Sequence, residues 1–118
     1  MVPVYAELWT FRKDLVPTHE IVGFEVDSRD GKIGKIDEMT DEVGRAAVVV
    51  DTGPWIFGRK VVIPAGTVTQ LDLDNEVLGV GLTKDQIKDS PEFKPDTDEY
   101  RSQEYRSELG TYYGQYRS

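Results

Sequence analysis

Apolar and polar residues alternate in short runs over residues 21–82, and turn-forming residues separate the runs. Val22, Phe24 and Val26 share one face of an extended chain, because the side chains of a strand alternate between its two faces. Asp30-Gly31 follows and predicts a tight turn, since glycine tolerates the positive φ that such turns need. The pattern therefore predicts a first strand that leads into a hairpin.

Residues 32–39 break this alternation, because their apolar residues Ile33, Ile36 and Met39 lie three positions apart. A helix is the competing interpretation of that spacing, but Gly31 and Gly34 together disfavour it. We predict a strand in which a bulge at Gly34 changes the face that the apolar side chains occupy.

Four further strands follow from the pattern. Residues 46–50 are a continuous apolar and β-branched run, which predicts a strand buried on both faces. Residues 60–63 form another short run, and residues 67–73 and 77–82 predict a hairpin that turns at Asp74-Asn75. Six short strands with regularly spaced turns are typical of a small all-β barrel or sandwich.

The two ends of the chain differ from this region. Thr83 and Gln86 form a capping box that predicts a short helix after the last strand. Residues 94–118 contain five of the six tyrosines, and we predict a Tyr-rich tail with a helix over 98–109 and a mobile end. Residues 1–20 predict an extended segment that docks through Trp9 and Phe11.

The motifs of residues 23–63 resemble the PRC-barrel family. They read Gly-Phe-Glu-Val, then Asp-Gly-Lys-Ile-Gly-Lys-Ile-Asp, then Val-Val-Val-Asp-Thr-Gly, then Lys-Val-Val-Ile-Pro. The likeness extends over residues 20–93, and the later part resembles small stand-alone bacterial members. It implies a six-stranded antiparallel barrel over residues 21–93 and a role as an adaptor in protein assemblies.

Charge and composition narrow the function classes. The chain has 118 residues, a net charge of −8 and no cysteine, which excludes disulfides and thiolate chemistry. Nucleic-acid binders usually carry a basic face, so we expect neither nucleic acid nor an anionic membrane surface as partner. The sequence has no signal-peptide pattern and no apolar run long enough to cross a membrane, and we expect a cytoplasmic location.

Two strings of residues invite a chemical interpretation. Asp51-Thr52-Gly53 after an apolar run is similar to the active-site loop of aspartic proteases, which need two carboxylates that share a proton. The alternative is an ordinary turn at a strand end, where Asp and Gly are favoured. Asp72, Asp74 and Glu76 alternate in the predicted hairpin, but they lack the glycine of a calcium loop and predict an acidic turn.

Aromatic residues are the strongest candidates for contacts with a protein partner. Large rings provide contact area at low entropic cost and are enriched at interfaces. One group lies in a loop, where it either closes one end of the barrel or forms an exposed patch. The other group lies in the tail, which either docks a partner or folds back on its own domain. The candidate contacts are Trp55, Phe57, Tyr105, Tyr112 and Tyr113.

The sequence therefore predicts a non-enzymatic protein-binding or assembly module with an unidentified protein partner, open to homodimers or higher homo-oligomers. We expect no catalytic residues, no cofactor and no metal, because His19 is the only histidine. Family analogy leaves an RNA- or ribosome-associated maturation factor as the alternative, and a homodimeric aspartic protease is a remote one.

Overall fold

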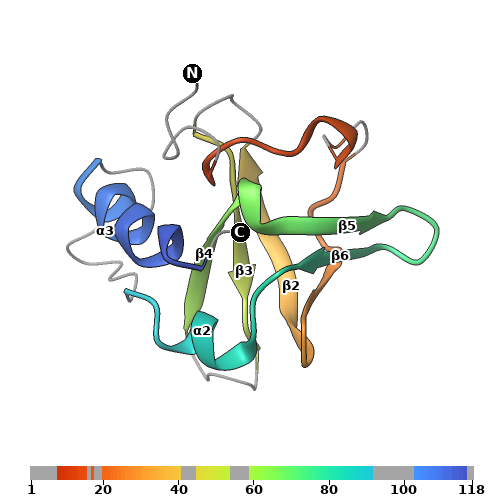
Figure 1. Cartoon of the computed structure of the whole chain (residues 1–118). Coiled ribbons are helices and arrows are strands. Elements are labelled where there is room, and N and C mark those ends of the chain that lie inside the picture. The colour runs from red at the N-terminus through yellow and green to blue at the C-terminus, as the bar shows by residue number, and fades with distance from the viewer. Residues whose placement is uncertain are drawn as a thin grey trace.

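The computed structural model describes residues 8–15, 17, 20–40, 45–53, 59–91 and 103–116. Within these residues, six strands form one sheet in the order β4-β3-β2-β1-β6-β5 (Figure 1). The strands are β1 (Glu25–Ser28), β2 (Gly31–Thr40), β3 (Ala47–Asp51), β4 (Lys60–Pro64), β5 (Val68–Asp72) and β6 (Val77–Val80). The helices are η1 (Lys13–Leu15), η2 (Ala65–Thr67), α2 (Lys84–Lys88) and α3 (Gln103–Gly114).

The mostly β class and the six strands are confirmed, but the predicted antiparallel barrel is wrong in two respects. Strand β6 pairs with β1 in parallel, and the order of strands leaves β4 and β5 as the two ends of an open sheet. After β4 the chain turns through η2 and returns as the β5–β6 hairpin on the far side of β1 (Figure 1). Alternation of side chains sets the buried face of a strand, but it sets neither its direction nor its neighbour.

Strand β2 contains the predicted bulge. Its pairing with β1 places Val26 opposite Gly34 and Asp27 opposite Lys32, so Ile33 is an extra residue. The pairing with β3 shifts again between Ile36 and Glu38. The two irregularities explain how apolar residues three positions apart in an extended strand all turn toward the core.

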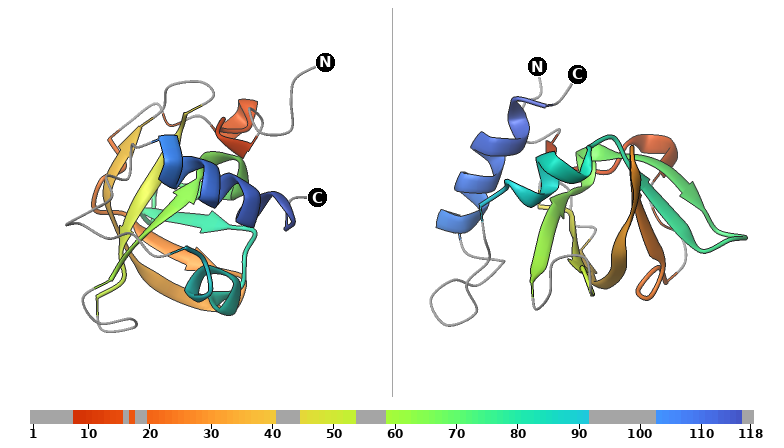
Figure 2. Two further views of the ribbon diagram at one scale, coloured as in Figure 1. Left: turned by 90° about the vertical axis from the view of Figure 1, so that its left-hand side faces the viewer. Right: turned by 90° about the horizontal axis from the view of Figure 1, so that it is seen from below.

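The core of the described residues is one continuous hydrophobic cluster. Strand β3 lies between β2 and β4 and is buried at its first four positions, as the continuous apolar run predicted. Helix α3 runs past the β4 side of the sheet, at the opposite side from the tip of the β5–β6 hairpin (Figure 2). The sheet, the N-terminal segment and helix α3 therefore share a single core.

Helix α2 begins with the predicted capping box. The Thr83 hydroxyl accepts a hydrogen bond from the Gln86 N–H at 3.2 Å, and the Gln86 side chain accepts one from the Thr83 N–H at 2.8 Å. The Asp30 carboxylate also accepts from the Lys84 N–H at 2.8 Å, and this bond lowers the pKa of Asp30. The β1–β2 turn thus fixes the start of α2.

Thr83→Ala is expected to lower the free energy of unfolding by about 1 kcal/mol, because the Gln86 N–H loses its acceptor. Urea unfolding followed by circular dichroism measures the change. Thr83→Ser keeps the hydroxyl and should restore most of the loss. A serine variant as unstable as the alanine variant would show that the methyl group, and not the cap, matters here.

Both chain ends differ in part from their predictions. Trp9 and Phe11 are buried in the core, in line with the expected docking. Trp9 lies in a turn, and Phe11 lies in the irregular chain between that turn and η1. The Trp9 carbonyl accepts a hydrogen bond from the Ala46 N–H at 2.8 Å. In the tail, α3 continues past the expected end to Gly114, and residues 98–102 lie outside the described residues.

Candidate functional site

One open, mostly apolar groove of the described surface measures about 460 Å³ and lies at one end of β2 and β3. Pockets that bind ligands commonly have this size and combine an apolar lining with a few polar groups. We refer to it as the β2–β3 groove. It is lined by Lys32, Ile33, Gly34, Lys35, Asp51, Thr52 and Gly53.

A close approach of two backbones shapes the groove. A Cβ added to Gly34 would overlap the Asp51 carbonyl oxygen and lie 3.0 Å from the Cα of Thr52. Lys35 pairs with Asp51 in the antiparallel β2–β3 ladder, which brings the two strands together at this point. The bulge at Ile33 and the absence of a side chain at Gly34 therefore allow β2 to cross directly against the end of β3.

The Asp51-Thr52-Gly53 string forms a turn at the end of β3. The Asp51 carboxylate accepts a hydrogen bond from the Gly53 N–H at 2.9 Å, and Gly53 has a φ of +54°. Thr52 is buried, and its hydroxyl donates to the Arg59 carbonyl at 2.6 Å. This geometry is that of an ordinary turn at the end of a strand, which was the alternative to an aspartic-protease loop for these three residues.

Lysines give the groove a positive rim. Lys32 forms an ion pair with Glu25 at 2.9 Å, which lowers the pKa of the Glu25 carboxyl. Lys60, next to this end of β3, pairs with Asp37 at 2.8 Å, and this hydrogen bond raises its pKa. Lys35 is exposed and forms no ion pair within the described part of the chain. The charge of Lys35 also helps to lower the pKa of Glu25, and the exposed Asp51 carboxylate lies in the same lining. Without an ion pair, the Lys35 ammonium group can still meet a carboxylate of a partner.

The described members of the predicted partner contacts, Tyr105, Tyr112 and Tyr113, all belong to α3. Trp55 and Phe57 lie outside the described residues. Tyr105 and Tyr113 are 2% and 0% exposed, so both rings lie inside the chain's own core, and burial raises the pKa of Tyr113 to about 12. Tyr112 is partly buried, and its hydroxyl donates to the Gln86 carbonyl. The described tyrosines therefore attach α3 to the domain.

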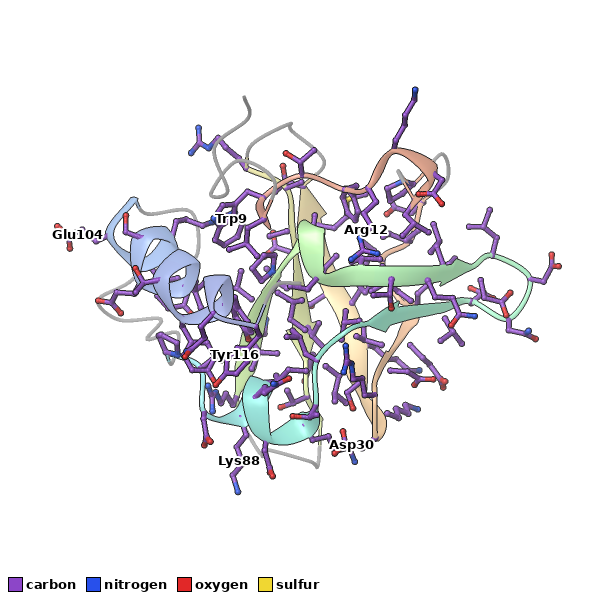
Figure 3. The ribbon with its side chains drawn as sticks, viewed as in Figure 1. Trp9, Arg12, Asp30, Lys88, Glu104 and Tyr116 are labelled. Carbon is purple, nitrogen blue, oxygen red and sulfur yellow. The ribbon has the colours of Figure 1, made fainter. Side chains whose placement is uncertain are left out.

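Arg106 is a residue that the sequence analysis did not single out. It is buried, its guanidinium lies 4.5 Å from the centre of the Trp9 ring, and it donates to the Arg45 carbonyl at 2.9 Å. Figure 3 shows Trp9 between α3 and the strands. The sequence Glu-Tyr-Arg-Ser occurs twice in the tail, at 99–102 and 104–107, and draws attention to these arginines. The repeat does not tell which of the two arginines is buried.

The remaining candidates form no site in the described residues. Asp72 accepts from the Asn75 N–H at 3.1 Å and from the Asn75 side chain at 2.7 Å, and these bonds lower its pKa. The acidic hairpin thus has the hydrogen bonds of a turn. The described residues contain no group of three or more metal-ligating side chains, and His19 lies outside them. None of the described helices is long and apolar enough to span a membrane.

Among known proteins, the chain resembles solved structures at a remote level. No family model and no curated protein sequence matches the chain. A solved structure from Pseudomonas aeruginosa, assigned as the 16S ribosomal RNA processing protein RimM, is 20% identical with a TM-score of 0.48. The match covers 64% of this chain and 50% of that protein, so the chain spans about half of its length. At this level the likeness carries no argument about function.

Proposed function

We propose that this chain is a non-enzymatic protein-binding domain, and that the β2–β3 groove holds a short segment of a partner protein. The observation that carries the proposal is the mostly apolar, open groove of about 460 Å³, whose rim carries a lysine, Lys35, that forms no ion pair among the described residues. Pockets for small ligands usually enclose most of the ligand surface, whereas an open groove covers one side of an extended chain.

Charge supports an acidic segment as the occupant. The whole chain carries −8, yet the groove presents Lys35 without an ion pair among the described residues. A carboxylate of the partner would meet this ammonium group, while an aliphatic or aromatic side chain would lie on the apolar lining. Among the described residues outside its direct chain neighbours, nothing lies within 4 Å of the Cβ position of Gly53.

The polar groups at the groove support binding over catalysis. The Asp51 carboxylate accepts the Gly53 N–H, and the Thr52 hydroxyl is buried and donates to the Arg59 carbonyl. Both groups hold the turn and are therefore poorly placed to act as a base or a nucleophile. The resemblance of the strand motifs to PRC barrels implies the same kind of adaptor role. The RNA-associated alternative and self-association stay predictions.

Lys35→Glu tests the proposal with a panel of fluorescein-labelled hexapeptides. The panel carries a central Leu or Phe between glutamates, and the comparison peptides carry lysine flanks or a central Ser. We expect saturable fluorescence polarisation with the acidic apolar peptides, and at least about tenfold weaker binding by the variant, since a like charge then faces the partner carboxylate.

Lys13→Glu is the matched control, because Lys13 is an exposed lysine in η1 that does not line the groove. It makes the same change in net charge and should leave the affinity within about twofold. Equal losses in both variants would show that peptides respond only to total charge. The absence of saturable binding by every acidic apolar peptide would reject the groove as a peptide site.

A further inference from the structure

A second cavity lies apart from the β2–β3 groove and shares no lining residue with it. It measures about 40 Å³ and lies where the N-terminal segment, the β1–β2 turn, η2, the β5–β6 pair and the end of α3 meet. Figure 3 labels two of its residues, Arg12 in the N-terminal segment near β5 and Tyr116 after α3. The lining consists of Arg12, Arg29, Gly66, Thr67, Thr69, Gly81 and Tyr116.

Two arginine side chains that have no counter-ion among the described residues line this cavity. Arg12 and Arg29 are exposed, and neither guanidinium has an ion pair or hydrogen bond within the described residues. The chain contains 22 acidic residues against 14 basic ones, so two arginines at one cavity without a carboxylate need an explanation. Like charges that face one cavity repel each other, and a bound anion removes that repulsion.

The backbone around the cavity is fixed and leaves room for a ligand. The Arg29 N–H donates to the Leu82 carbonyl, and the Gly81 N–H donates to the Thr67 carbonyl, both at 2.8 Å. A Cβ at Gly81 would lie 3.0 Å from the Thr69 Cγ2 and 3.9 Å from Nη2 of Arg29. Glycine at this position therefore keeps the space between Thr69 and the guanidinium open.

Hydroxyl groups complete the polar lining. Thr69 is exposed and has no side-chain hydrogen bond within the described residues, whereas the Thr67 hydroxyl donates to the Pro64 carbonyl at 2.7 Å. Tyr116 is 36% exposed at the edge of the cavity. Two planar guanidinium forks on one small cavity are donors that proteins use for oxyanions, and Thr69 adds a residue with a hydroxyl to the same lining.

We propose that this cavity binds a phosphate group, and we name it the Arg12–Arg29 pocket. Its volume of about 40 Å³ holds about three water-sized groups, which is the scale of a small tetrahedral oxyanion. The guanidinium groups donate to separate phosphate oxygens, and the Thr69 hydroxyl donates to a third. The ligand is free phosphate or a phosphate ester, and these two sources share the same recognition chemistry.

Titration of the full chain with inorganic phosphate at constant ionic strength, followed by two-dimensional amide NMR, tests the proposal. We expect saturable shifts of the Gly66, Thr69 and Gly81 amide signals, which lie at the pocket. Arg29→Gln and Arg12→Gln should each weaken binding at least about tenfold, since each removes one charged fork. Chloride at the same ionic strength should cause no saturable shift.

Arg45→Gln is the control, because Arg45 is an exposed arginine that does not line the pocket. It should bind phosphate as the parent chain does. Equal weakening in all three variants, or shifts that grow linearly without saturation, would overturn the proposal. Glycerol 3-phosphate binding as tightly as inorganic phosphate would support an ester as ligand, and binding of inorganic phosphate alone would support the free anion. Lys35→Glu should leave phosphate binding unchanged, so this test is independent of the peptide groove.

Discussion

Gly34→Ala is expected to lower the free energy of unfolding by more than about 3 kcal/mol, enough to leave much of the chain unfolded. The added Cβ would overlap the Asp51 carbonyl oxygen and approach its carbonyl carbon to 2.9 Å. The clashing atoms belong to the backbone of β3, which is paired with β2 and β4 and cannot rotate away as a side chain would. Relief requires separation of β2 from β3 at the groove. Chemical unfolding monitored by tryptophan fluorescence measures the loss.

Gly114→Ala is the control for this substitution. Gly114 is the last residue of α3, and no described residue beyond its chain neighbours and its own helix lies within 4 Å of its Cβ position. Alanine is a better helix former than glycine, so stability should be unchanged or slightly higher. If Gly34→Ala were as stable as the parent chain, β2 and β3 would not approach as closely as the structure describes. The shape of the β2–β3 groove would then need revision.

Leu109→Ala has the second largest expected effect, a loss of about 2 to 4 kcal/mol in the free energy of unfolding. Leu109 is 0% exposed in α3, between the buried rings of Tyr105 and Tyr113 along the helix. Its truncation removes apolar contacts and leaves a cavity between the helix and the rest of the core. Differential scanning calorimetry should show the change as a lower melting temperature of the whole chain.

Thr111→Ala separates packing from helix propensity. Thr111 is an exposed residue of the same helix, and its replacement should change stability by less than about 0.5 kcal/mol. If Leu109→Ala also left the melting temperature unchanged, the tail would not be part of the cooperative core. The tail would then be free to dock a partner, which is one of the two alternatives that its tyrosines left open.

Local patterns in the sequence determined a large part of the fold. The pattern of apolar residues located five strands closely, but it placed the first strand too early, because Val22 lies exposed in a turn and β1 begins at Glu25. The spacing of Ile33 and Ile36 located a bulge, and Thr83 with Gln86 located α2. These features depend on residues a few positions apart, and the physical rules that govern them act at the same short range. The acidic balance and the absence of cysteine likewise follow from the sequence alone.

Only the tertiary structure decided which strands became neighbours and which aromatic residues became core. The parallel pairing of β1 with β6 joins segments about fifty residues apart, and the order of the sheet follows from that pairing. Tyr105, Tyr113 and Tyr116 are the same residue type, so their identity does not tell which ring is buried. In the structure the rings of Tyr105 and Tyr113 are buried, whereas Tyr116 is 36% exposed.

The two candidate sites were likewise decided by the tertiary structure. The β2–β3 groove and the Arg12–Arg29 pocket each bring together residues from separate segments, and no single motif contains either set. Asp30 was predicted as a turn residue, yet its carboxylate also binds the first N–H of α2, 54 positions away. Sequence patterns specify what each segment prefers by itself, whereas burial of a shared core selects which segments meet.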